Sequence, residues 1–265
     1  MTDTNQPTLD QVIEWAKHAG TIAREGFLGD HDIAFKGSTD LVTEVDFQCE
    51  KYLVDSIRAA YPPHSILTEE AGAVNGENTD RWFIDPLDGT INYAHGIPLY
   101  VISIAYAREG RVQLGVVYDP SRKECYYAER GKRAWLNGET LSVSGCNDLQ
   151  QALLATGFPY HSLEKFRHNL RVFAKLTQET QGVRRLGCAA LEVCYVGSGR
   201  FDGYWEQEIN AWDVAAGTLI AEEAGATVTD LTGDPNYFKP PYAILAAAPG
   251  IHGQLVALFR QLDQT

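Results

Sequence analysis

The sequence is poor in several features that mark particular classes of protein. Its five cysteines form no C-x-x-C pair and are odd in number, which argues against a disulfide framework and favours reduced thiols. Its longest apolar stretches, such as residues 99–107, are too short to span a bilayer. The first seven residues are polar and lack the apolar core of a secretory signal. We therefore expect a cytoplasmic protein with no membrane partner.

Positive charge is also scarce. The chain carries 22 basic and 35 acidic residues, a formal net charge of −13. This balance argues against nucleic acid as the main partner, but an anionic substrate stays possible because bound cations reverse the local field. At 265 residues and 45% hydrophobic content, the chain can form one large or two modest domains around a substantial core.

One stretch, residues 82–98, combines features that suggest chemistry. Residues 82–84 are apolar and predict a buried strand, which we expect to break at Asp85. Asp85 and Asp88 would be costly to bury without a cation, and Mg²⁺ prefers such oxygen ligands. Gly89 lets a ligand approach its backbone, and a helix beginning near Thr90 would direct N–H groups at a phosphate. Taken alone, the stretch favours a metal-assisted phosphatase no more than an ordinary surface turn.

The first half of the chain predicts two helices followed mainly by sheet. Apolar residues recur at helical spacing from Leu9 to Phe27, and a second helix begins near Thr43 and ends before the prolines at 62 and 63. Between them, residues 29–40 are polar and predict a loop. Turns are expected at residues 119–120 and 137–138. The further strands expected are 65–68, 100–107, 113–118, 124–128 and 140–143.

The second half alternates between strand and helix. Strands are expected at 152–157, 182–186, 203–206, 227–230 and 243–248, and helices at 163–176, 188–196, 213–224 and 251–262. Such alternation indicates an α/β unit with helices covering a sheet. We expect an N-terminal α+β half, residues 1–145, and a C-terminal α/β half, residues 146–265, joined in one compact unit.

Four acidic residues stand at the ends of predicted elements: Glu69, Asp85, Asp88 and Asp213. Buried carboxylates are rare unless they are paired or bind metal. Individually, Asp213 is typical of a first-turn helix carboxylate, and Glu69 beside Glu70 of a solvated pair. The small residues 215–217 would allow the helix after Asp213 to pack closely. His95, His161 and His168 have no metal-ligand spacing.

The order of these motifs resembles the inositol monophosphatase family. The sequence D-P-L-D-G-T at 85–90, followed by N-Y at 92–93 and H-G-I-P at 95–98, is similar to the first family signature. The sequence W-D-V-A-A-G at 212–217, leading into E-E-A-G, is similar to the second. Residues 40–43 with Asp46, and residues 68–70, match two upstream motifs. The resemblance covers nearly the whole chain.

The resemblance implies both a fold and an activity. The fold would be α/β (α+β), a layered α-β-α-β-α sandwich of the inositol monophosphatase and fructose-1,6-bisphosphatase type, assembled as a homodimer. The substrate would be a small phosphorylated polyol or sugar. The reaction would be hydrolysis of inositol 1-phosphate by a metal-activated water, dependent on Mg²⁺ and sensitive to lithium.

The resemblance also implies roles for particular residues. One Mg²⁺ would be bound by Glu69, Asp85 and the Leu87 carbonyl, a second by Asp85, Asp88 and Asp213, and a third, weaker one near Glu69. Asp46 and Thr90 would orient the attacking water, with Glu69 also counted as catalytic. The amides of Gly89 and Thr90 would hold phosphate, and Glu206 would contact sugar hydroxyls. Gly187, Cys188 and Ala189, with Asp88 and Asp213, would complete the substrate site.

Three departures and several alternatives leave the exact substrate open. Ile91 stands where Thr is common, Cys188 where a hydroxyl residue is usual, and Arg133 where Gly is usual. A fructose-1,6-bisphosphatase or a broader sugar-phosphate or NADP phosphatase of the same family is the nearest alternative. A haloacid-dehalogenase-type phosphatase fits less well, because its D-x-D-G-T motif has one residue fewer. A catalytically silent, protein-binding homologue would show a lost ligand, and none is lost.

Overall fold

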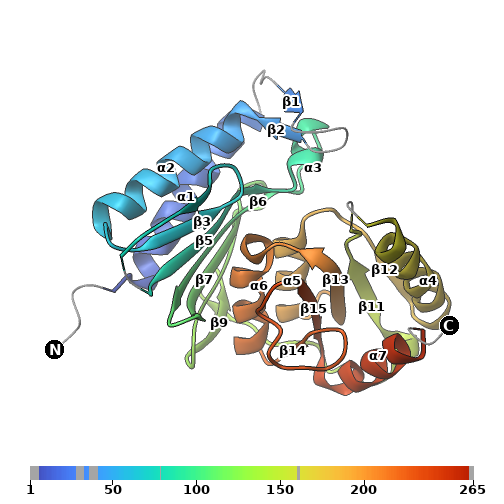
Figure 1. The fold of residues 1–265 in the computed structure, drawn as a ribbon. Coiled ribbons are helices and arrows are strands. Elements are labelled where there is room, and N and C mark those ends of the chain that lie inside the picture. The colour runs from blue at the N-terminus through green and yellow to red at the C-terminus, as the bar shows by residue number, and fades with distance from the viewer. Residues whose placement is uncertain (1–5, 28–32, 36–40, 78, 160–161, 263–265) are drawn as a thin grey trace.

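The computed structural model describes residues 6–27, 33–35, 41–77, 79–159 and 162–262. Its elements form five layers (Figure 1). Helices α1 (Leu9–Phe27) and α2 (Glu44–Ala60) cover the outer face of a first sheet. Helices α5 (Ala189–Gly197) and α6 (Ala211–Glu223) lie between this sheet and a second, whose outer face is covered by α4 (Leu163–Glu179) and α7 (Pro249–Leu262). The expected α-β-α-β-α layering is confirmed.

The first sheet has eight strands in the order β10-β9-β8-β7-β6-β5-β3-β4. Their bounds are β3 (Ser65–Thr68), β4 (Gly72–Val74), β5 (Arg81–Asp88), β6 (Val101–Arg108), β7 (Arg111–Asp119), β8 (Glu124–Glu129), β9 (Arg133–Leu136) and β10 (Glu139–Thr140). Strands β3 and β5 are parallel, with Thr68 opposite Ile84, and the other pairs are antiparallel. Because parallel strands end at the same edge, this register brings Glu69 beside Asp85.

The second sheet has five strands in the order β12-β11-β13-β15-β14. Their bounds are β11 (Leu153–Thr156), β12 (Gly182–Arg184), β13 (Gly203–Ile209), β14 (Thr227–Thr229) and β15 (Tyr242–Ala247). Strand β11 is parallel to β12 and β13, whereas β15 is antiparallel to both its neighbours. A separate pair, β1 (Ile33–Phe35) and β2 (Leu41–Thr43), and two short helices, α3 (Thr90–Ala94) and η1 (Leu149–Gln151), complete the described elements.

The helices follow their sequence patterns. In α1 the buried residues Val12, Ala16, Ala19 and Ala23 recur every three or four positions and face the sheet. Helix α6 is buried almost all round, as a helix between two sheets must be. Its small residues allow close approach, because a Cβ added to Gly115 of β7 would stand 2.9 Å from the Ala216 carbonyl oxygen. The predicted close packing of residues 215–217 is confirmed.

Two strand predictions were wrong. Strand β5 does not break at Asp85 but pairs with β6 as far as Asp88, with an irregular register between these aspartates. A bulge there tolerates Pro86, which has no N–H to donate to the ladder. Residues 140–143 are not a strand beyond Thr140, because the Val143 N–H donates to the Ala224 carbonyl at the end of α6. Strands β1, β2, β4 and β9 were not predicted, and β1 lies within the predicted loop 29–40, so that prediction was wrong at residues 33–35.

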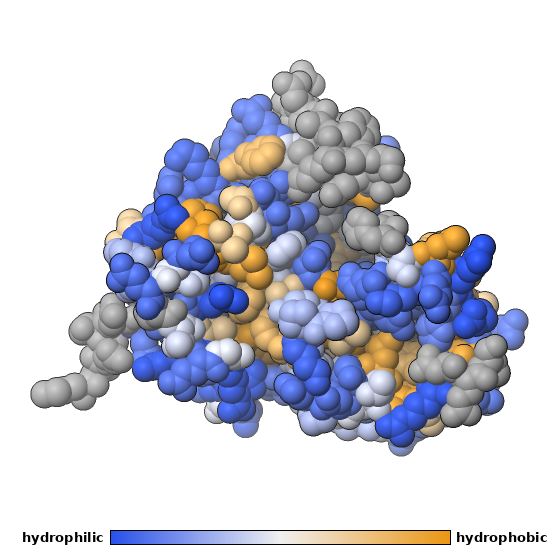
Figure 2. Space-filling view, viewed as in Figure 1, coloured by the Kyte–Doolittle hydropathy of each residue, from blue (hydrophilic) through white to orange (hydrophobic). Residues whose placement is uncertain are grey.

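Several other predictions concern residues that the structure describes only in part or not at all. Asp40, His161 and most of the predicted loop 29–40 lie outside the described residues. The chain passes from the first sheet to the second between Thr140 and Leu153, and the division at residue 145 stays a prediction. None of the helices in the described ranges combines the length and apolar character needed to cross a bilayer. Hydrophilic side chains cover most of the face seen in Figure 2.

Candidate functional site

A cleft of about 280 Å³ is lined by residues of both sheet regions. All but one of the predicted site residues line it: Glu69, Asp85, Leu87, Asp88, Gly89, Thr90, Gly187, Cys188, Ala189, Glu206 and Asp213. The exception is Asp46, which is buried behind the cleft at the first turn of α2. The tertiary structure therefore brings together residues that lie far apart in the sequence.

The first wall of the cleft is the end of β5. The Asp85 carboxylate, which is 2% exposed, accepts the Leu87 N–H at 3.0 Å. Gly89 has a φ of 94°, and a Cβ there would stand 2.6 Å from the Leu99 carbonyl oxygen. A left-handed turn with so close a contact favours glycine.

Asp46 reaches this wall through Thr90. The Thr90 hydroxyl lies 3.0 Å from Asp46 Oδ1 and 2.9 Å from the Leu87 carbonyl oxygen, so it can donate to either. The other Asp46 oxygen accepts the Thr43 N–H at 2.9 Å, within the capping box of α2. Asp46 is thus held by its own helix and presents one oxygen toward the cleft.

The second wall comes from three elements of the second sheet region. At the start of α5, the Ala190 N–H donates to Asp88 Oδ2 at 2.7 Å. Asp213 accepts the Asn210 N–H at 2.9 Å in the capping box of α6, so its predicted place in a first helical turn is confirmed. Glu206 lies on β13 and accepts a hydrogen bond from the Tyr204 hydroxyl.

The acidic residues of the cleft destabilise one another's charges. Burial raises the pKa of Asp85, and the neighbouring charges of Glu69, Asp88 and Asp213 raise it further. Burial also raises the pKa of Asp88, of Asp213 and of Glu206 to about 7 each. A bound cation would relieve this repulsion.

The donor set fits a hard divalent cation. The side chains of Glu69, Asp85, Asp88 and Asp213 contribute carboxylate oxygens, and the Leu87 backbone contributes a carbonyl oxygen. Mg²⁺ prefers oxygen ligands of these kinds. Within the described part of the chain, no three Asp, Glu, His or Cys side chains are already gathered as a coordination shell. Asp85, Asp88 and Asp213 each accept a backbone N–H.

The sequence reasoning missed several residues of the cleft, among them Arg185, Glu192 and Glu208. Glu192 could have been found, since it is the one charged residue of the otherwise apolar helix α5. Burial raises its pKa to about 8. Arg185 lowers the pKa of Glu206 by its positive charge, against the larger effect of burial. No local sequence pattern marks Arg185 or Glu208.

The three residues that depart from the family pattern lie in different parts of the structure. The buried Cys188 thiol donates to the Asp88 carbonyl at 3.5 Å, and burial raises its pKa, so it acts as a neutral donor. Ile91 lines the cleft and is 39% exposed. Arg133 begins strand β9 at the far end of the first sheet and does not line the cleft.

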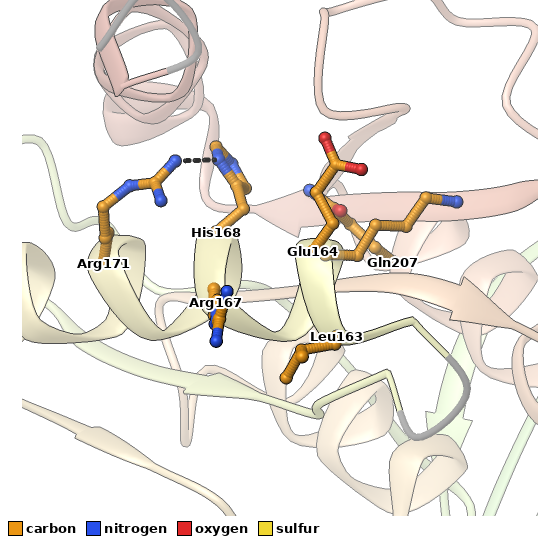
Figure 3. Close-up of a pocket in the computed structure, with 7 residues that line it drawn as sticks. Leu163, Glu164, Arg167, His168, Arg171 and Gln207 are labelled. Carbon is orange, nitrogen blue, oxygen red and sulfur yellow. Dashed lines mark hydrogen bonds between the residues drawn. The ribbon is translucent and has the colours of Figure 1, made fainter.

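A second hollow, of about 660 Å³, lies along α4 (Figure 3). It is lined by Leu163, Glu164, Lys165, Arg167, His168, Arg171 and Gln207. An Arg171 nitrogen lies 3.4 Å from His168 Nδ1 on its surface. None of the predicted site residues lines this hollow. The smaller cleft is therefore the candidate site.

The fold and the cleft together define an α-β-α-β-α protein with an oxygen-donor site between its two sheets. The model of the inositol monophosphatase family matches residues 4–264. The Nus factor SuhB of Pasteurella multocida is 41% identical over 248 residues, which cover 92% of each chain.

Solved structures agree with this match. The extragenic suppressor protein suhB of Bartonella henselae has a TM-score of 0.89 and 34% identity, covering 94% of this chain and 96% of that one. The inositol monophosphatase of Anabaena has a TM-score of 0.85 and 39% identity, covering 96% and 95%. The chain belongs to the inositol monophosphatase family, which is generally metal-dependent.

Proposed function

We propose that the protein is a Mg²⁺-dependent phosphomonoesterase that hydrolyses inositol 1-phosphate to inositol and phosphate. The observation that carries this proposal is the meeting of four carboxylates, Glu69, Asp85, Asp88 and Asp213, in one cleft with Gly89 and Thr90. The membership of the chain in the inositol monophosphatase family supports it. We also propose the homodimer and the sensitivity to lithium that the family resemblance implies.

The metal ligands that we propose are the ones that the family resemblance implies. Glu69, Asp85 and the Leu87 carbonyl would hold one Mg²⁺, Asp85, Asp88 and Asp213 a second, and a third would bind weakly near Glu69. When bound, these ions supply neutralising charge to the phosphoryl oxygens and lower the pKa of a water. The fit rests on the all-oxygen donor set and on the raised pKa of Asp85, Asp88 and Asp213.

The residues of the chain orient the reactants. When the Thr90 hydroxyl donates to Asp46, its oxygen lone pairs are left to accept a hydrogen from water, which fixes that water at the end of β5. Phosphoryl transfer needs the water in line with the leaving oxygen, so this position matters more than nucleophilicity. The amides of Gly89 and Thr90 hold the phosphoryl oxygens, and Gly89 has no Cβ to obstruct them.

The opposite wall selects the leaving group. Glu206 would accept hydrogen bonds from polyol hydroxyls, and such charge-assisted bonds are stronger than neutral ones. Gly187, Cys188 and Ala189 line the same side and would contact the ring. A fructose-1,6-bisphosphatase or a broader sugar-phosphate phosphatase would use the same residues, so the substrate requires a direct test.

A panel of phosphate esters tests the proposal. With Mg²⁺ we expect inositol 1-phosphate to be hydrolysed with the highest kcat/KM, EDTA to abolish the reaction, and Li⁺ titrated at fixed Mg²⁺ to reduce it. Full activity in metal-free buffer would contradict the metal-dependent mechanism. A higher kcat/KM for fructose 1,6-bisphosphate would make that sugar the proposed substrate and leave the proposed mechanism unchanged.

A regulatory, protein-binding role is a second candidate. It is favoured by the name Nus factor, which relatives about two-fifths identical to this chain carry. A folded protein that hydrolyses no ester of the panel in Mg²⁺ would support this role over the first. The two roles are compatible, because the proposed ligands are all present.

A further inference from the structure

The described residues include five buried carboxylates: Asp46, Glu50, Asp85, Asp119 and Glu192. Asp46 and Asp85 belong to the proposed site. Asp119 holds the turn after β7, where it accepts the Ser121 N–H and pairs with the Arg122 guanidinium at 2.9 Å. Glu50 and Glu192 are left without a role, although burying a carboxylate is costly.

Glu50 holds the turn that carries Glu69. It projects from α2 and is 6% exposed. One of its oxygens accepts the Thr68 hydroxyl at 2.5 Å and the Glu70 N–H at 2.9 Å, and the other accepts the Ala71 N–H at 3.0 Å. These donors lie on both sides of Glu69, so the backbone of Glu69 is fixed from α2.

Glu192 holds the opposite wall in the same way. It projects from α5 and is 1% exposed. One oxygen accepts the Leu186 N–H at 3.1 Å and the other accepts the Cys188 N–H at 3.3 Å. These donors flank Gly187, whose φ is 75°.

A side chain from the first sheet region also forms hydrogen bonds to this loop. The Asn92 amide nitrogen of α3 lies 2.9 Å from the Leu186 carbonyl oxygen and 3.3 Å from that of Gly187. Glu192 therefore accepts hydrogen bonds from the N–H groups of the loop, and Asn92 donates hydrogen bonds to its carbonyls. The loop is held to both regions of the molecule.

We propose that Glu50 and Glu192 are a pair of positioning residues, one for each wall of the cleft. Glu50 places Glu69 for the cation, and Glu192 places the segment from Gly187 to Ala189 for the substrate. The assignment of cation and substrate to these walls rests on the proposed function. Each glutamate acts through hydrogen bonds to a neighbouring turn or loop, most of them from backbone N–H groups, and does not itself contact a reactant.

The variants Glu50→Gln and Glu192→Gln separate the two roles. Each keeps the side-chain shape but replaces one acceptor oxygen with a donor, so one buried N–H loses its partner. We expect Glu50→Gln to weaken Mn²⁺ binding, measured by electron paramagnetic resonance, by about tenfold, and to leave KM unchanged at saturating metal. We expect Glu192→Gln to raise KM for inositol 1-phosphate by about tenfold and to leave Mn²⁺ binding unchanged.

Glu124→Gln is the matched control. Glu124 lies on β8, outside the cleft, and pairs with Arg200 at 2.6 Å. Its loss should lower the melting temperature without changing KM or Mn²⁺ binding. If Glu50→Gln and Glu192→Gln also change only the melting temperature, the positioning roles are overturned.

Amide hydrogen exchange tests the same proposal without substrate. Exchange at Glu70 and Ala71 should accelerate in Glu50→Gln, and exchange at Leu186 and Cys188 in Glu192→Gln, and unchanged exchange would refute the proposal. If a variant does not fold, these four amides in the unmutated protein decide: exchange as fast as in unprotected peptide overturns it. A protein without phosphatase activity would refute the proposed function while leaving this measurement and Mn²⁺ binding intact.

Discussion

The two walls of the cleft are built in different ways. Most of the first wall comes from residues 85–90, at the end of one strand, where several bonds are local, such as those from Leu87 N–H to Asp85 and from Thr90 to the Leu87 carbonyl. The second wall combines the loop at Gly187, strand β13 with Glu206, and helix α6 with Asp213. Most of the first wall forms within one bulged strand, with Glu69 added by the turn after β3, whereas the second needs three elements to dock.

Hydrogen bonds join the two walls. The Ala190 N–H donates to Asp88, and the Asn92 amide donates to the Leu186 carbonyl. Because each bond joins α5 or its preceding loop to the first wall, the second wall is aligned by the first. Changes at these joints should therefore have larger effects on catalysis than changes confined to one wall.

The largest effect is expected from Asp88→Asn, at the joint itself. Asparagine keeps the shape but removes one charge from the proposed cation site, so kcat/KM should fall on the order of a thousandfold. Since burial raises the pKa of Asp88, its ionised form is destabilising, and the melting temperature should not fall. Steady-state kinetics in Mg²⁺ and thermal unfolding test both statements.

A matched control for this change is Asp148→Asn, at the partly buried N-cap of η1, outside the cleft. It removes the same charge away from the cleft and should leave kcat/KM unchanged. Near-normal activity in Asp88→Asn would show that the site has been assigned wrongly, and the comparison of the two walls would lose its basis.

An intermediate effect is expected from Glu206→Gln, in the second wall. We expect transition-state stabilisation, measured from kcat/KM for inositol 1-phosphate, to fall by about 1–3 kcal/mol, because hydrogen bonds to polyol hydroxyls are weakened. Hydrolysis of p-nitrophenyl phosphate, which has no such hydroxyls, should change little. Equal losses on both substrates would instead mean that Glu206 supports the proposed metal site or the fold.

Glu208→Gln provides the control for Glu206→Gln. Glu208 also lines the cleft but forms an ion pair with Lys165 at 2.6 Å. Removing its charge should change the two substrates alike and only slightly. A selective loss on inositol 1-phosphate in this variant would move the polyol contact from Glu206 to Glu208.

The smallest effect is expected from Arg133→Gly, outside both walls. Arg133 is exposed and has a φ of 124°, a region that favours glycine. Relief of backbone strain of about 1 kcal/mol should raise the melting temperature by roughly 2–4 °C. Calorimetry tests this, and kcat/KM should stay unchanged. A lower melting temperature would show that the arginine side chain outweighs the strain.

Local chemistry in the sequence determined much of this protein. The spacing of apolar residues predicted α1 at its observed bounds, and the capping pattern at Thr43 predicted the start of α2. The turn at Asn137 was also predicted correctly, and both turn residues have positive φ. These features depend on neighbours in the chain, so they can be read without a structure. The motif residues were assigned by family resemblance, and their roles stay predictions.

Only the tertiary structure decided how these pieces meet. Strand β5 continues through Asp85 because β6 lies beside it, and the chain leaves the sheet after Thr140 because the end of α6 offers an acceptor. Glu192 stands out in the sequence as the one charged residue of α5, but its hydrogen-bond partners depend on the loop at Gly187 lying against it. Burial and long-range hydrogen bonds depend on residues distant in the chain, and no local pattern carries that information.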